Sequence, residues 1–260
     1  MPVPLDPSAR IARTHVETLR RSGSVFAEEE LTALAEAADD TDGLADLVAR
    51  RAAGVPIELL VGYAWFGELR IAVAPGVFIP RHRTEYLVDR ACRRVRRGDA
   101  VLDLGCGTGA VGALLAHRVA GLALTAMDSD PAAVACARSN LPPSARVVRG
   151  DSPAVLAPAR FRAIVANLPY VPSGRVAYLP HDARDWEPRE ALDGGTDGLD
   201  PLRRVAPDLL ARLVAGGWFL LELAADQVNT ARTVLAEAGF TPSAVVVTDD
   251  GETSVIEVRT

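Results

Sequence analysis

The sequence predicts an α/β fold built on a doubly wound, mostly parallel sheet of seven strands, preceded by a small helical domain. Two observations lead to this class. From residue 84 onward, short apolar runs alternate with helical patterns, which is typical of parallel strands joined by helices. Residues 8–53 instead place leucines at loosely helical spacing among many alanines, which favours a helical bundle.

The same patterns divide the chain into three segments. We predict an N-terminal helical domain over residues 1–53 and a β-hairpin or irregular linker over residues 54–80, where glycine and proline recur. Residues 81–260 then form the α/β domain. With 260 residues, the chain is long enough for one large domain and a smaller one.

Seven apolar runs are predicted as strands, over residues 100–104, 122–127, 146–148, 161–166, 218–223, 244–247 and 255–258. Helices are predicted over residues 84–97, 109–120, 131–140, 201–214 and 227–238. The last two strands have no helix between them and are joined by Asp249, Asp250 and Gly251. That turn chemistry indicates an antiparallel pair at the sheet edge.

Composition excludes several classes of function. The net charge of -6 counts against a broad nucleic-acid surface, since phosphate binding needs clustered cations. All 28 basic residues are arginine, so lysine Schiff-base chemistry is impossible. Three scattered cysteines and the absence of metal-ligand spacing suit a reducing compartment and no metal site. Without a membrane-length apolar run or an apolar signal core, we expect a cytoplasmic protein that does not bind membranes.

A glycine-rich loop follows the first predicted strand and consists of Gly105, Cys106, Gly107, Thr108 and Gly109. Glycines allow the backbone to turn tightly and approach a ligand closely, and the next helix presents free N–H groups. The spacing is GxGxG, so we favour a nucleoside over a dinucleotide. Asp128 ends the next strand, where a carboxylate can accept ribose hydroxyl hydrogens. We interpret Cys106 as a packing residue, because no adjacent base would activate it as a nucleophile.

The fourth predicted strand runs into Asn167, Leu168, Pro169 and Tyr170. A doubly wound sheet binds ligands at this end of its strands. An amide nitrogen is a poor nucleophile, but Asn167 and a backbone carbonyl of Leu168 or Pro169 can accept its two hydrogens and stabilise the developing positive charge. Tyr170 offers a flat face for a planar group. The alternative is an ordinary proline-containing turn.

Here the sequence resembles the HemK-type protein N5-glutamine methyltransferases, which act on peptide-chain release factors. The resemblance extends from residue 54 and rests on the glycine loop, Asp128, Asn167 to Tyr170, and two further segments. These are residues 78–85, which include Phe78-Ile79-Pro80-Arg81 and Thr84-Glu85, and residues 187–200. The second segment, beginning Glu187-Pro188-Arg189, is the most specific because generic methyltransferases do not carry it.

The resemblance implies a class I, Rossmann-like fold and S-adenosylmethionine as methyl donor, with S-adenosylhomocysteine as product. It implies cofactor contacts from residues 105–109, Asp128, Ser152 and Asn167, and a turn at Asp151 or Ser152 against the adenine. Asp151 is also explained as a plain loop residue. Residues 167–170 would grip a glutamine amide, and the helical domain would help to hold the release factor.

One departure keeps alternatives open. The family usually has Asn-Pro-Pro-Tyr, and Leu168 replaces the first proline here, which retains the carbonyl but restores an N–H. Asn-Leu-Pro-Tyr also appears in ribosomal RNA adenine dimethyltransferases, so an adenine amine of RNA or DNA is a neighbouring target. Another protein, a small amide, or a scaffold without turnover are the remaining hypotheses.

Overall fold

The computed structural model describes residues 7–247 and 253–260. Within them the chain forms two compact units. One comprises the N-terminal region to Tyr63 together with residues 180–186, and the other comprises residues 64–179 and 187–260. The predicted turn at Asp249, Asp250 and Gly251 lies outside the described residues.

The first unit is helical, as predicted. It contains α1 (Pro7–Arg21), α2 (Ala27–Ala37), α3 (Thr41–Ala52), α4 (Ile57–Val61) and the separate helix α8 (His181–Trp186). The side chains buried between these helices are those of Leu19, Ala27, Leu34 and Val48. Asp40 caps α3 by accepting a hydrogen bond from the Gly43 N–H at 2.7 Å.

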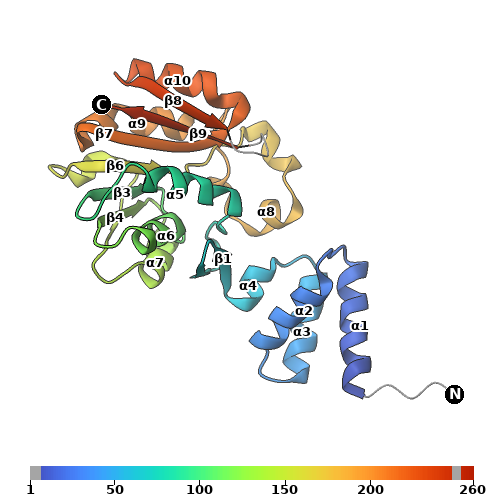
Figure 1. The fold of residues 1–260 in the computed structure, drawn as a ribbon. Coiled ribbons are helices and arrows are strands. Elements are labelled where there is room, and N and C mark those ends of the chain that lie inside the picture. Colours follow the sequence, from blue (N-terminus) through green and yellow to red (C-terminus); the bar gives the residue numbers. More distant parts are fainter. Residues whose placement is uncertain (1–6, 248–252) are drawn as a thin grey trace. The chain divides into compact units, whose positions relative to one another are not determined.

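The second unit contains a seven-stranded sheet with the order β5-β4-β3-β6-β7-β9-β8 (Figure 1). The strands are β3 (Ala100–Leu104), β4 (Ala123–Asp128), β5 (Arg146–Arg149), β6 (Phe161–Ala166), β7 (Leu213–Ala224), β8 (Thr241–Val247) and β9 (Thr253–Arg259). Strand β9 is antiparallel to both β7 and β8, and the other strand pairs are parallel. This confirms the doubly wound, mostly parallel sheet and its antiparallel edge.

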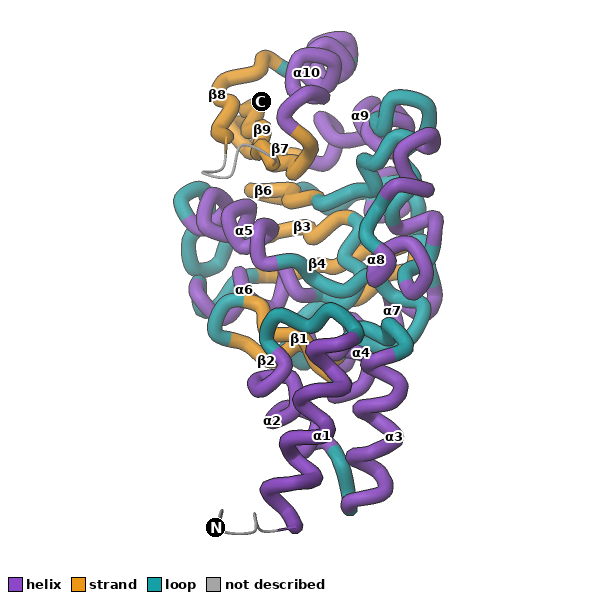
Figure 2. The backbone as a smooth tube through the Cα atoms, turned by 90° about the vertical axis from the view of Figure 1, so that its right-hand side faces the viewer, coloured by secondary structure: helices purple, strands orange, loops and turns teal. Residues whose placement is uncertain are grey.

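Helices cover both faces of this sheet (Figure 2). One face packs on α5 (Glu85–Cys92), α6 (Ala110–Arg118) and α7 (Pro131–Asn140). The other packs on α9 (Asp200–Arg212) and α10 (Val228–Glu237). Alternate strand residues therefore enter different cores: Leu102 and Ile164 face α9 and α10, whereas Val101 and Ala163 face α5 and α6.

The predicted hairpin is present as β1 (Tyr63–Phe66) and β2 (Leu69–Ala72), joined through Gly67. Phe66 and Ile71 are buried in the core beneath α5 and α6. The Asn140 amide closes the edge of β2, since it accepts from the N–H and donates to the carbonyl of Ala72, both at 2.8 Å. The same predicted segment also contains α4, which the glycine and proline pattern did not indicate.

Two element boundaries differ most from the prediction. The helix expected over residues 84–97 is a short 3-10 turn (His82–Thr84) followed by α5, which ends at Cys92. Strand β7 begins at Leu213 rather than residue 218, because its first residues pair with the start of β6 before a register shift. Tertiary contacts, rather than the local sequence pattern, decide the extent of the helix α5 and of the pairing of β7.

Glu257 binds the end of α5 to β9. Its side chain is fully buried on the α5 face of β9, and its carboxylate binds Arg90 in the last turn of the helix and Arg94 just beyond it. The Arg94 guanidinium also stacks 4.0 Å from the ring centre of Trp218. Arg94 is therefore held by both the Glu257 carboxylate and the Trp218 ring. Within the described residues, no helix combines the length and the apolarity needed to cross a bilayer.

The aromatic core of the second unit gives a stability prediction. Phe219 is fully buried, with its ring centre 6.3 Å from that of Phe240. We expect Phe219→Ala to lower the free energy of unfolding by about 3–5 kcal/mol, through lost burial and the cavity left behind. Urea unfolding followed by circular dichroism measures the change. Tyr178→Ala, at a side chain 86% exposed, is the control and should change stability by less than about 0.5 kcal/mol; equal effects would contradict the assignment.

Candidate active site

The register of β3 and β6 brings the two predicted site segments together. Leu104 pairs with Ala166, so Gly105 and Asn167 leave adjacent parallel strands at the same edge. The chain departs from β3 to β4 on one side and returns to β6 on the other. A crevice for ligands forms at such a switch point, outside the carboxyl ends of the strands.

The glycine loop turns sharply between β3 and α6. Its three glycines have positive φ values of 71° at Gly105, 51° at Gly107 and 80° at Gly109. The N–H groups of Gly105 and Cys106 both donate to the Met127 carbonyl, at 2.8 and 3.0 Å, which fastens the loop to the end of β4. These hydrogen bonds to β4 therefore hold the loop in its conformation at the edge of the sheet.

Asp103 supports this loop from below. Its buried carboxylate accepts a hydrogen bond at 2.9 Å from the N–H of Gly112 in the first turn of α6. Burial, with a contribution from the charge of Asp128, raises the pKa of Asp103 to about 7. The strand and the helix that carry the loop are thus joined directly by one side chain.

Asp128 lies at the end of β4, as predicted. One carboxylate oxygen accepts from the Gly107 N–H at 2.9 Å and the other from the Asp130 N–H at 3.0 Å. Burial raises the pKa of this carboxyl group. The two bonds hold the carboxylate against the glycine loop and leave its remaining lone pairs for a ligand.

The other predicted cofactor residues have different surroundings. Asp151 is exposed, whereas the Ser152 hydroxyl bonds to the Asp208 carboxylate and accepts from the Ala154 N–H at 3.1 Å. Ser152 therefore caps a short 3-10 turn. Cys106 and Thr108 are buried in the loop, and burial raises the pKa of the Cys106 thiol, which disfavours a thiolate.

Asn167 is held by a residue that the site prediction did not include. Its amide nitrogen donates to the Thr84 hydroxyl at 3.1 Å, while its amide oxygen has no hydrogen-bond partner among the described residues. Thr84 is buried at the start of α5. The only sequence signal for Thr84 was its place in the segment 78–85, which had no assigned chemistry.

Leu168 directs its side chain away from this edge. It is 9% exposed and belongs to the core beneath α9 and α10. A Cβ placed on Gly105 would lie 2.9 Å from Leu168 Cδ2. The leucine side chain therefore occupies the space beside Gly105 that a Cβ there would fill. Replacing proline by leucine at this position changes the packing of the core and does not present a new side chain to a substrate.

Tyr170, at the end of the segment, is half-buried, and its hydroxyl bonds to two side chains. It donates to Glu222 Oε1 at 3.3 Å and accepts from Arg83 at 3.1 Å. Burial, followed by the charge of Glu222, raises the pKa of Tyr170 to about 12. A lone glutamate within the apolar run of β7 was the available sequence signal for Glu222, but it gave no indication of its partners.

The glycine-rich part of segment 187–200 holds the backbone after Tyr170. Gly194 donates to the Val171 carbonyl at 2.8 Å, and the Gln227 amide donates to the carbonyls of Tyr170 and Asp197 at 2.7 and 2.9 Å. At Gly198 a Cβ would come within 2.1 Å of the Tyr170 carbonyl oxygen, so only glycine fits. Segment 187–200 therefore positions the chain that follows residues 167–170.

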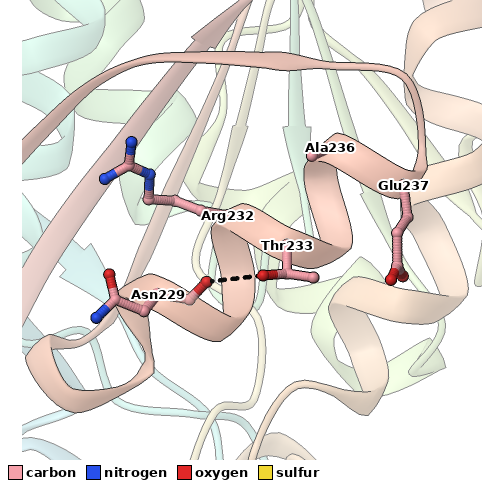
Figure 3. Close-up of a pocket in the computed structure, with 5 residues that line it drawn as sticks. All are labelled: Asn229, Arg232, Thr233, Ala236 and Glu237. Carbon is pink, nitrogen blue, oxygen red and sulfur yellow. Dashed lines mark hydrogen bonds between the residues drawn. The ribbon is translucent and has the colours of Figure 1, made fainter.

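A surface depression on α10 is separate from these contacts. It is lined by Asn229, Arg232, Thr233, Ala236 and Glu237, and none of the predicted site residues takes part (Figure 3). Thr233 hydrogen-bonds only back to the Asn229 carbonyl at 3.3 Å. Across the described residues, no group of three His, Cys, Asp or Glu side chains is arranged to hold a metal; the expectation of no metal stays a prediction.

The contact between Gly105 and Leu168 gives a second stability prediction. In Gly105→Ala, the positive φ of 71° and the Leu168 contact should together lower the free energy of unfolding by about 2 kcal/mol. Denaturant titration measures the loss. Gly174→Ala is the matched control, because its Cβ would meet no atom within 4 Å. Equal stability of the two variants would contradict the packing described.

Comparison with known proteins agrees with this geometry. The family model "Methyltransferase small domain" matches residues 68–179. The release factor glutamine methyltransferase of Geobacter sulfurreducens is 39% identical over 75% of this chain and 69% of its own length. That of Deinococcus radiodurans is 34% identical over 89% of this chain and 83% of its own length.

A solved structure supports the fold independently. A methyltransferase from Pyrococcus furiosus, 17% identical, superposes with a TM-score of 0.55 over 85% of this chain and 98% of its own. The sheet order and its helices are thus those of a class I methyltransferase. Together with the identity to curated relatives over most of their length, this shows that the chain belongs to the release factor glutamine methyltransferase family.

Proposed function

We propose that this chain transfers a methyl group from S-adenosylmethionine to the side-chain amide nitrogen of a protein glutamine, in the Gly-Gly-Gln motif of peptide-chain release factors. The observation that carries the proposal is the placement of Asn167 to Tyr170 beside the glycine loop, at the tips of β6 and β3. Family membership supports the same reaction.

The loop residues fit the cofactor that the family implies. A Cβ on Gly107 would meet no atom within 4 Å, so the backbone there is open to a ligand. Each oxygen of Asp128 accepts one backbone hydrogen bond, and a carboxylate has about four lone-pair sites, which leaves two for ribose hydroxyls. S-adenosylmethionine, when bound, supplies a methyl group on a positively charged sulfur.

We assign the remaining cofactor contacts from the positions of the residues at the ends of the strands. Residues 105–109 would line the donor, and Asn167 would contact it from the neighbouring strand tip. Asp151 is exposed and free to bind the adenine amine. Because the Ser152 hydroxyl is engaged by Asp208, Ser152 would contribute through its backbone.

The substrate amide is handled by the chain segment 167–170. The free oxygen of Asn167 would accept one hydrogen of the glutamine NH₂, and the carbonyl of Leu168 or Pro169 would accept the other. Tyr170 would provide a flat wall. These acceptors orient the nitrogen lone pair and stabilise its positive charge as the N–C bond forms and the S–C bond breaks. The extra proton leaves the nitrogen after transfer.

The helical unit is proposed to recognise the protein substrate. It has a core of its own and an exposed apolar pair, Val25 and Phe26, between α1 and α2. Exposed apolar side chains of this kind suit protein contacts. Removal of residues 1–53 should therefore weaken methylation of an intact release factor more than cofactor binding.

The substrate assignment is tested by mass. With isotopically labelled cofactor, we expect an intact release factor to gain one methyl group, located by peptide sequencing on the glutamine of its Gly-Gly-Gln motif. A release factor with that glutamine replaced by asparagine is the control and should gain none. Transfer to ribosomal RNA, or to another protein with none to either release factor, would contradict the proposed substrate.

The role of Asn167 is tested by kinetics. Asn167→Ala should lower kcat by roughly 10²-fold, the scale of removing one preorganised polar group at a developing charge. Single-turnover assays separate this from cofactor affinity, which equilibrium binding measures. An unchanged kcat in a folded variant would favour the scaffold hypothesis instead.

A further inference from the structure

A buried carboxylate lies next to the amide site without an assigned role. Glu222 of β7 is 1% exposed and faces the side of the sheet covered by α5. Its Oε1 accepts from the Tyr170 hydroxyl at 3.3 Å and lies 3.7 Å from Arg83 Nε. Its Oε2 has no hydrogen-bond partner within the described part of the chain. A buried, incompletely paired carboxylate costs stability, so its presence in an apolar strand needs a reason.

Thr84 connects this carboxylate to Asn167. Its hydroxyl accepts from the Asn167 amide nitrogen at 3.1 Å, so its own hydrogen must be directed to a different acceptor. We assign the neighbouring carboxylate of Glu222 as that acceptor, because the Thr84 hydroxyl favours the charged form of Glu222 and so lowers its pKa. Thr84 therefore lies between a group that only accepts and an NH₂ that only donates.

We propose that Glu222 is a positioning residue that fixes the direction of this hydrogen-bond chain and so determines which atom of Asn167 faces the substrate. The proposal rests on the proposed function. An ionised Glu222 makes Thr84 donate to it and accept from the Asn167 NH₂, which leaves the Asn167 oxygen for the substrate NH₂. If Thr84 instead donated to the Asn167 oxygen, the hydrogen bonds would run in the opposite direction. Asn167 would then present its own NH₂ to the substrate NH₂, and two donors would face each other.

The same carboxylate also orients Tyr170. The phenol donates to Glu222 and accepts from Arg83, so its hydroxyl is held from both sides. Both walls of the amide site, Asn167 and Tyr170, thus depend on one buried group on β7. The only other buried glutamate facing α5 within the described residues, Glu257, binds Arg90 and Arg94 at the opposite end of that helix.

Because the proposed role of Glu222 depends on its charge, it predicts a pH dependence of kcat. Burial raises the pKa of this carboxyl group, whereas Arg83 and the hydroxyls of Thr84 and Tyr170 oppose the rise. As the pH falls through that raised pKa, Glu222 becomes protonated and can donate a hydrogen bond. The hydrogen bonds from Asn167 through Thr84 to Glu222 then no longer have a fixed direction, and kcat falls. Arg83 keeps its charge and Tyr170, with its pKa near 12, stays neutral through this range.

The test compares Glu222→Gln with Glu257→Gln, the same chemical change at two buried positions facing one helix. Glu222→Gln can donate as well as accept, so we expect kcat to fall by at least about 10-fold, with cofactor affinity within about twofold of wild type. Its acid limb should differ from that of wild type, because Asp103 and Asp128, whose pKa values are also raised, are present in both proteins and Glu222 is not. Glu257→Gln should keep both the wild-type kcat per folded molecule and the acid limb, whatever its effect on thermal stability.

Thr84 variants keep the test decisive if Glu222→Gln does not fold. Thr84→Val preserves shape but removes the hydroxyl, and should lower kcat as Glu222→Gln does, whereas Thr84→Ser should retain activity. The double variant Glu222→Gln/Thr84→Val should be no slower than the worse single variant.

Two results would overturn the inference: wild-type kcat and acid limb in folded Glu222→Gln, or equal activity of Thr84→Val and Thr84→Ser. Failure of the wild-type enzyme to methylate any release factor would instead overturn the proposed function.

Discussion

The parallel pairing of β3 with β6 is the constraint on which the site depends. It fixes Leu104 opposite Ala166, and thereby the glycine loop beside Asn167. Buried side chains on both faces of these strands hold that register, because a slip by one residue would exchange Leu102 and Val101 between two different cores. In-line transfer between two bound groups requires this kind of fixed placement.

Support for the substrate edge comes from segments distant in sequence. Gln227 binds the backbone of Tyr170 and Asp197, and Gly198 permits the close approach. Glu187, at the start of the same segment, accepts hydrogen bonds from the Ile79 N–H at 2.9 Å and from Arg81 at 2.8 Å. Segments 78–85 and 187–200, which are both part of the family resemblance, therefore hold residues 167–170 and their surroundings in place.

Sequence reasoning predicted those parts of the site that are local in the chain. The glycine loop, Asp128 and residues 167–170 each follow directly from a strand, so strand order alone placed them at one edge. Thr84, Glu222 and Gln227 were missed because their roles come from contacts across 83, 52 and 57 residues, respectively. The contacts of Glu257 on the distant strand β9 with Arg90 at the end of α5 and with Arg94 beyond it could not be predicted for the same reason.

The exchange of proline for leucine at position 168 is compatible with the proposed chemistry. In the proposed reaction the motif acts through the Asn167 amide, one or two carbonyls and the Tyr170 ring, and none of these needs the side chain of residue 168. In this chain the Leu168 side chain is buried between β-strand residues and the bare backbone of Gly105. Proline would restrict φ by its ring, whereas here packing against the core restrains the same backbone. Under the proposed function, either restraint would hold the carbonyl of residue 168 where a substrate amide can bind it. The restraint would come from the proline ring in the usual motif and from core packing of Leu168 in this chain.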